Sequence, residues 1–141
     1  MNIKQFNDWL SSDNKQSLIM GILNVTPDSF SDGGQYFDKN VAVEHALAMI
    51  RNGANIIDIG GESTRPFSDP VSLDEEISRV IPVIKGIRKK SDVCISIDTT
   101  KSMVASEALH VGASIINDVS AMEVDPFMAC LLYTSDAADE E

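Results

Sequence analysis

The amino-acid sequence predicts an α/β fold built on parallel strands, and two observations support this class. Four short apolar runs rich in β-branched residues are continuous rather than alternating, which is typical of strands buried on both faces of a parallel sheet. Helical patterns separate these runs, so strand and helix alternate along the chain and right-handed parallel crossovers are expected. Two arrangements satisfy this order, a (β/α)8 barrel and an open doubly wound sheet.

The first segment of the chain carries apolar side chains at a helical spacing, at Ile3, Phe6, Trp9 and Leu10. A short helix or a covering turn is therefore expected before the first strand. The predicted strands are, in order, LIMGIL (18–23), NIIDI (55–59), VCISI (93–97) and ASIIN (113–117).

One helix is predicted in each interval between strands, over residues 41–54, 72–90 and 101–113. Gly53 and Gly112 stand where C-terminal caps would end the first and the third of these helices. The second helix starts with a serine cap and acidic residues and ends with basic ones, an order that suits the helix dipole. Pro82 is expected to kink or interrupt it.

The composition is that of a globular protein and argues against several classes of partner. The formal charge of −11 comes with no basic stripe, which disfavours a nucleic-acid or acidic-membrane partner. Cys94 and Cys130 give neither a disulfide framework nor a metal-ligand spacing, which fits a reduced setting. No early apolar stretch resembles a signal peptide, and no run reaches transmembrane length. A cytoplasmic protein is therefore expected.

Polar side chains recur at the carboxyl end of every predicted strand, whereas the amino ends carry no comparable cluster. In chain order they are Asn24; Asp58, Glu62, Thr64 and Arg65; Asp98 and Lys101; and Asn117 and Asp118. In a barrel these positions converge on one face, where active sites are built from the βα loops. Taken singly, Asp98 or Asp118 could be a helix cap alone.

The residue types at these strand ends limit the chemistry. No GxGxxG follows the first strand and no GxxxxGK[ST] occurs, so dinucleotide-binding and P-loop proteins are disfavoured. His45 and His110 fall within helical patterns, and no cysteine stands at a strand end. Asp and Asn side chains suit a heterocycle that presents both donors and acceptors. An oxygen ligand such as Asn24 suits Mg²⁺ bridging to a substrate phosphate, so a diphosphate leaving group would fit.

Four segments in series resemble the dihydropteroate synthase family. They are ILNVTPDSFSDGG (22–34), IDIGGESTRP (57–66), ISIDTTK (95–101) and INDVS (116–120), and the resemblance covers about residues 18 to 125. It implies a TIM barrel that joins a dihydropterin to 4-aminobenzoate. The amine would attack the exocyclic methylene carbon of the pterin, diphosphate would leave, and dihydropteroate would form on the route to folate.

The resemblance assigns binding roles to four strand-end residues. Asn24 would bind the Mg²⁺ that accompanies the diphosphate, which makes Mg²⁺ the expected cofactor. Asp98 and Asn117 would hydrogen-bond the pterin ring from within the barrel mouth. Thr64 would lie at the pterin diphosphate.

The resemblance also assigns roles to residues in the two loops that follow the first and second strands. Arg65 and Pro66 would lie beside Thr64, and Phe30 and Pro66 would help to enclose aminobenzoate. Asp32 would order the first loop over the leaving group and stabilise the positive charge that develops at the methylene carbon. Asp32 and Arg65 are accordingly the predicted catalytic residues.

The resemblance extends over part of the family's length, because a TIM barrel typically needs about 250 residues. Residues 1–130 are therefore interpreted as the amino-terminal half of such a barrel. Residues 131–141 form an acidic tail that departs from the family pattern. A truncated reading frame with little or no synthase activity of its own is expected, whereas a full-length relative is expected to form a homodimer.

Two other functions remain open from the sequence. The first is another pterin-binding barrel, such as a methyltetrahydrofolate methyltransferase, although its members are not expected to carry NVTPDSFSDGG. The second is a non-catalytic fragment or paralogue that keeps a partial pterin site. Small-molecule substrates are the expected partners if the chain belongs to a synthase or a methyltransferase.

Overall fold

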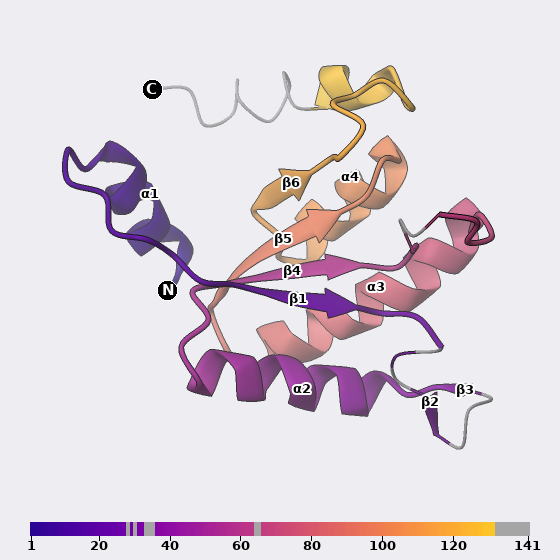
Figure 1. Cartoon of the computed structure of the whole chain (residues 1–141), viewed down its shortest axis with the longest axis horizontal. Helices are drawn as coiled ribbons and strands as arrows, with labels where there is room; N and C mark the ends of the chain where they lie inside the picture. The colour runs from indigo at the N-terminus through magenta and orange to yellow at the C-terminus, as the bar shows by residue number, and fades with distance from the viewer. Residues whose placement is uncertain (28, 30, 33–35, 64–65, 132–141) are drawn as a thin grey trace.

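The computed structural model describes residues 1–27, 29, 31–32, 36–63 and 66–131, with the backbone alone for residues 31, 32, 36 and 37 (Figure 1). Its helices are α1 (Ile3–Ser11), α2 (Lys39–Arg51), α3 (Leu73–Arg88) and α4 (Ser102–Val111). Its strands are β1 (Met20–Asn24), β2 (Ser31–Asp32), β3 (Tyr36–Phe37), β4 (Ile56–Gly60), β5 (Cys94–Asp98) and β6 (Ile115–Asn117).

Four of the strands form one parallel sheet in the order β1-β4-β5-β6. This spatial order is also the order along the chain, so each new strand is added beside the previous one. The helices α2, α3 and α4 pack side by side along one face of the sheet (Figure 1). A doubly wound sheet would instead reverse its strand order and carry helices on both faces. The structure therefore shows the winding of a (β/α)8 barrel, over about half its strands.

The core lies between the sheet and these three helices. Leu23, Ile57, Ile59, Ile95 and Ile97 are fully buried in it. Successive side chains of a strand point to opposite faces, so the neighbours of these residues point away from the helices. Burial on both strand faces is confirmed for β4 and β5 and is wrong for β1.

The reason for the difference is the position of β1 at the edge of the sheet. Ile22 is 54% exposed, and Met20 beside it is also exposed. The inner strands β4 and β5 have a neighbour on each side, which shields their second face. Local sequence carries no information on that distinction, because both kinds of strand are continuous apolar runs.

The helices follow the predicted caps closely. The hydroxyl of Ser72 accepts a hydrogen bond from the amide of Glu75, 3.2 Å away, at the start of α3. Gly53 and Gly112 adopt φ values of 111° and 131°, which favour glycine over any other residue. Pro82 lies inside α3 without interrupting it. The buried face of this helix, which includes Val80 and Val83, holds it on the sheet despite the hydrogen bond that a proline removes.

Two further features complete the described chain. The expected short helix is present as α1, which lies beyond the amino ends of the strands (Figure 1). The carbonyl of Met1 accepts a hydrogen bond of 2.8 Å from the amide of Cys94, which joins this segment to β5. β2 and β3 pair as a small antiparallel hairpin within the β1–α2 connection, which the sequence did not predict. None of the described helices combines the length and apolar character needed to cross a bilayer.

Candidate active site at the carboxyl ends of the strands

The last residues of the four parallel strands form one cross-strand row. Asn24 is in register with Gly60, Gly60 with Asp98, and Asp98 with Asn117. Leu23, Ile59 and Ile97, which precede three of them, are buried in the core. The side chains of the row therefore point away from the helices, toward the face that is the interior of a barrel. Three residues predicted from separate segments of sequence are thus brought together.

Asp98 is the electrostatic centre of this row. Its pKa is raised to about 6, chiefly by burial and also by the negative charges of Asp58, Glu76 and Asp118. Gly60 makes room for its side chain, because a Cβ at this position would lie 3.3 Å from both Cβ and Oδ2 of Asp98. The carboxyl group is therefore poised between its neutral and its charged form near pH 6.

Asp98 does not act as the cap of α4. Lys101 is the N-cap residue of this helix and makes no side-chain cap hydrogen bond. The amide of Ser102 instead donates to Oδ2 of Asp125, 2.7 Å away. The interpretation of Asp98 as a helix cap alone is wrong, and its carboxyl group remains available to the face described above.

Asn117 extends the row inward by its contact with Asp58. Its Nδ2 lies 3.3 and 3.4 Å from the two carboxylate oxygens of Asp58, so the carboxamide is oriented with its nitrogen toward β4. Asp58 is only 3% exposed and stands two residues before the end of β4. Together they present acceptors and donors on the same face of the sheet as Asp98.

Ser96 lies beside Asp58 in the register of β4 and β5 and belongs to the same face of the sheet. It is fully buried, and its hydroxyl has no hydrogen-bond partner within the described residues. A buried hydroxyl without a partner is costly, so this position marks an incomplete polar site. Sequence reasoning missed Ser96 because a serine within an apolar run is equally typical of a strand interior.

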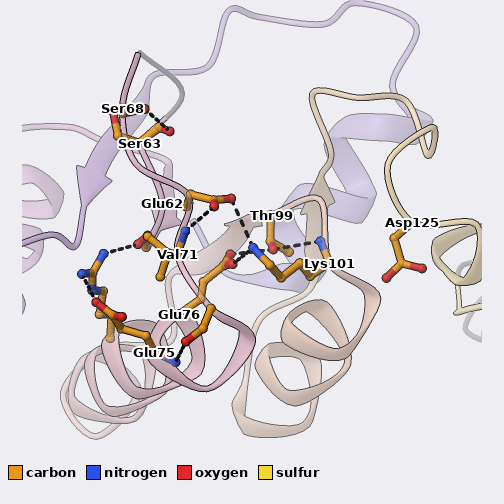
Figure 2. A network of polar contacts seen from close by, with 12 residues as sticks. Glu62, Ser63, Ser68, Val71, Glu75, Glu76, Thr99, Lys101 and Asp125 are labelled. Atoms are coloured by element: carbon orange, nitrogen blue, oxygen red, sulfur yellow. Dashed lines mark hydrogen bonds and ion pairs between the residues drawn. The ribbon is translucent and has the colours of Figure 1, made fainter. Parts of the chain in front are cut away.

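A second polar cluster joins the connections that follow β4 and β5 (Figure 2). Nζ of Lys101 lies 2.7 Å from Oε1 of Glu76 and 3.2 Å from Oε1 of Glu62. The other carboxylate oxygen of Glu76 accepts a hydrogen bond of 2.7 Å from the hydroxyl of Thr99. Glu76 is fully buried on α3, and its charge is therefore matched by Lys101. We call Glu62, Glu76, Thr99 and Lys101 the Lys101 cluster.

Glu76 was not predicted as part of any site. The sequence presents it as one of three acidic residues in the first turn of a helix. One signal could have distinguished it, since Glu76 stands four residues before Val80 and seven before Val83, on the buried stripe of α3. An acidic residue on an apolar stripe indicates a buried charge that needs a partner.

Asp118 is a turn residue. One of its carboxylate oxygens accepts hydrogen bonds from the amide and hydroxyl of Ser120, at 2.9 and 2.7 Å. The other accepts from the amide of Met122, at 2.9 Å. It shapes the turn after β6, so the interpretation of Asp118 as a helix cap alone is wrong.

The remaining predicted loop residues are described only in part. Pro66 is exposed. Thr64 and Arg65, which precede it, lie outside the described residues, as does Phe30. Asp32 belongs to β2, for which the backbone alone is described. Phe67, which was not predicted, is 104% exposed and adopts a φ of 67°, in the left-handed region.

Only Asn24 represents the predicted metal site among the described side chains. It ends β1 and is exposed, which leaves its carboxamide oxygen open to a ligand. No group of three or more His, Cys, Asp or Glu side chains able to hold a metal occurs within the described part of the chain. One oxygen ligand, completed by water and phosphate, is nevertheless a donor set that Mg²⁺ accepts.

We predict a pH-dependent stability difference between the protein and its Asp98→Asn variant. The folded-state pKa of Asp98 is raised from 3.8 to about 6, so its stabilising contribution is complete below about pH 4 and is lost as the pH rises through 6. As the pH rises from 4 to 6.5, the free energy of unfolding of the variant should therefore increase by roughly 1 to 2 kcal/mol relative to that of the parent, allowing for solvent screening. Urea denaturation at several pH values measures the difference, and a constant offset across this range would contradict the prediction.

Comparison with known proteins places this geometry in context. The family model described as pterin binding enzyme matches residues 20–138. The chain is 61% identical to the dihydropteroate synthase of Bacillus subtilis over 115 residues, which cover 82% of this chain and 40% of that protein. It is 51% identical to the dihydropteroate synthase of Clostridium beijerinckii over 132 residues, covering 86% of this chain and 49% of that protein.

Solved structures show the same similarity. The dihydropteroate synthase of Clostridium difficile, determined in the presence of pteroic acid, aligns with a TM-score of 0.81 and 52% identity, over 86% of this chain and 46% of that chain. The enzyme of Xanthomonas albilineans with 4-aminobenzoic acid aligns with a TM-score of 0.78 and 44% identity, over 83% of this chain and 42% of that chain. The chain thus spans between two fifths and half of the length of the curated relatives that it matches.

Proposed function

The chain belongs to the pterin binding enzyme family, and from this premise we propose that it supplies the pterin-recognising half of a dihydropteroate synthase barrel. The reaction joins a (dihydropterin-6-yl)methyl diphosphate to 4-aminobenzoate. The amine nitrogen forms a bond to the exocyclic methylene carbon, the carbon–oxygen bond to diphosphate breaks, and the amine loses a proton. The products are 7,8-dihydropteroate and diphosphate.

The observation that carries this proposal is the row of strand ends. Asp98 and Asn117 stand side by side in register, and Asn117 is oriented by the buried carboxylate of Asp58. A pterin ring presents donors and acceptors along one edge, which a carboxylate and a carboxamide can pair simultaneously. Asp98 in its charged form would accept from ring N–H groups, and the carboxamide oxygen of Asn117 faces away from Asp58 and is free to accept as well.

The relatives support the choice of substrates. The structure of the Clostridium difficile enzyme was determined with pteroic acid, and structures of the Xanthomonas albilineans enzyme contain 4-aminobenzoic acid or 7,8-dihydropteroate. These ligands contain the pterin and aminobenzoate halves of the proposed reaction. A homodimer, which the family resemblance implies, and a cytoplasmic setting, which the cysteine pattern favours, belong to the same proposal.

Mg²⁺ is part of the proposal through Asn24. The carboxamide oxygen of this residue, exposed at the end of β1, would hold the ion together with water and diphosphate oxygens. The ion would neutralise the charge on the leaving group. In the connections that follow, Asp32 and Arg65 would act in catalysis, Thr64 would contact the diphosphate, and Phe30 and Pro66 would border aminobenzoate.

The chemistry places modest demands on the protein. Diphosphate is a good leaving group, and the pterin stabilises the methylene carbon from which it departs. No strong nucleophilic side chain is therefore needed, and the row of strand ends contributes by binding and orienting the ring. A site made of carboxylates and carboxamides is sufficient for this binding and orienting role.

Binding measurements distinguish the proposal from its alternatives. Because the chain spans less than half of its relatives, the sample is a chimera in which residues 1–131 replace the matching segment of the Bacillus subtilis relative. We expect calorimetry to detect dihydropterin diphosphate binding that depends on Mg²⁺. Preferential binding of methyltetrahydrofolate would instead favour a methyltransferase, and binding of neither would favour a non-catalytic paralogue.

A further inference from the structure

The side chain of Glu62 joins the two ends of the connection between β4 and α3. Oε2 of Glu62 accepts a hydrogen bond of 2.8 Å from the amide of Val71, nine residues later (Figure 2). A second bond, 3.1 Å from the hydroxyl of Ser68 to the carbonyl of Ser63, crosses the same connection. The ends of the segment 62–71 are therefore held together, and Glu62 makes the bond nearest to the sheet.

The amino end of this segment is also fixed against α3. Nη1 of Arg79 donates a hydrogen bond of 2.9 Å to the carbonyl of Gly61. A Cβ at Gly61 would lie 3.0 Å from Cγ1 of Val80, so the chain passes close to the helix here and a side chain would crowd it. The position of Glu62 is consequently determined by the packing of α3 on the sheet.

Lys101 connects the base of this segment to the end of β5. Its ammonium group bridges Glu62, at 3.2 Å, and Glu76, at 2.7 Å, and it stands three residues after Asp98. Partial burial pulls the pKa of Lys101 down, but the hydrogen bonds and charges of Glu76 and Glu62 outweigh burial and raise it. The bridge therefore stays charged across the physiological range.

The bridge is stiffened by Thr99, which lies between Asp98 and Lys101. The hydroxyl of Thr99 donates to Glu76 at 2.7 Å and accepts from the amide of Lys101 at 3.1 Å. The turn that follows Asp98 and the base of the 62–71 segment are thus both attached to one buried carboxylate. These hydrogen bonds restrict the side-chain rotations that would separate the turn after Asp98 from Glu62.

We propose that Glu62 and Lys101 are positioning residues, which hold residues 62–63 and 66–71 in a fixed relation to Asp98 by tying both to Glu76. This inference rests on the proposed function, in which Thr64 would contact the diphosphate while Asp98 would bind the pterin ring. Neither residue needs to contact substrate. Their effect would be to fix the distance and orientation between two parts of one ligand site.

Glu62→Ala is the informative variant, because it leaves the buried Glu76 paired with Lys101. In the full chain, amide hydrogen exchange of Val71 should accelerate by about tenfold or more, since its acceptor is lost, while the amides of Ile59 and Ile97 should be unchanged. Glu62→Gln keeps an acceptor oxygen and should restore most of the protection. The matched control is Glu44→Ala, which removes an exposed ion pair with Lys90 and should leave Val71 unaffected.

A second readout separates positioning from general stability. In the chimera, Glu62→Ala should weaken dihydropterin diphosphate binding by about tenfold and leave a dihydropterin without the diphosphate within about twofold. Unchanged exchange at Val71, or equal weakening of both ligands, would overturn the inference. If the parent chimera binds neither ligand, the proposed function fails, and the Val71 exchange rates still decide whether Glu62 anchors the segment.

Discussion

Replacing Lys101 with methionine is expected to lower the free energy of unfolding by about 3 kcal/mol. The change leaves the fully buried carboxylate of Glu76 without its charged partner, which is among the costliest single substitutions in a protein interior. The cost should lie at the lower end of the range for removing one partner of a buried ion pair, because the Lys101 side chain is itself 27% exposed and water replaces part of the lost interaction. Chemical denaturation monitored by the far-ultraviolet circular dichroism signal measures the loss.

A second substitution shows whether the buried charge is the cause. The double variant Lys101→Met/Glu76→Gln removes both charges and retains an acceptor for the Thr99 hydroxyl. It should recover a large part of the stability lost in the single variant, since no uncompensated charge remains. A single variant within about 1 kcal/mol of the parent, or a double variant no more stable than the single one, would contradict the assignment.

Replacing Asp98 with alanine in the chimera is expected to weaken pterin binding by roughly 10- to 150-fold, the range for loss of hydrogen bonds to a charged group. The residue lies in the row formed by Asn24, Gly60 and Asn117, where its carboxyl group faces the barrel interior. Calorimetry with a dihydropterin at pH 7.5, where Asp98 is charged, measures the effect. At pH 5 the parent should itself bind about tenfold less tightly, because the raised pKa leaves most of Asp98 protonated.

Asp118→Ala is the matched control for this experiment. Asp118 is also a carboxylate beyond a strand end, but its oxygens are engaged by Ser120 and Met122 in a local turn. Its loss should destabilise that turn and leave pterin affinity within about threefold. Equal losses for the two variants would show that the assay reports general damage to this end of the sheet.

The parallel strands and their helices could be predicted from the sequence because their signals are local. Continuous apolar runs and helical stripes identify the elements, and the final polar residue of a run identifies its end. The row of Asn24, Asp98 and Asn117 followed from the same reasoning, since equivalent ends of parallel strands lie together. The polar strand ends and the family resemblance favoured a barrel over a doubly wound sheet, and the observed strand order confirms that prediction.

Other features depend on contacts between distant segments, which local patterns do not encode. The pairing of Glu76 with Lys101 joins α3 to the turn after β5, and the unpartnered hydroxyl of Ser96 is defined by its surroundings within the described chain. The β2–β3 hairpin has strands of two residues each, too short for an alternating pattern. The exposure of Ile22 results from the position of β1 at the edge of the sheet, which the sequence of β1 does not encode.

Under the proposed function, the strand ends of this chain would form the pterin side of a dihydropteroate synthase site. The most direct test is to measure dihydropteroate formation by the chimera from dihydropterin diphosphate and 4-aminobenzoate with Mg²⁺. We expect turnover by the parent chimera and a loss of roughly 10- to 150-fold in kcat/KM for Asp98→Ala, with Asp118→Ala close to the parent. A folded chimera that forms no dihydropteroate, or one in which Asp98→Ala leaves kcat/KM unchanged, would contradict it.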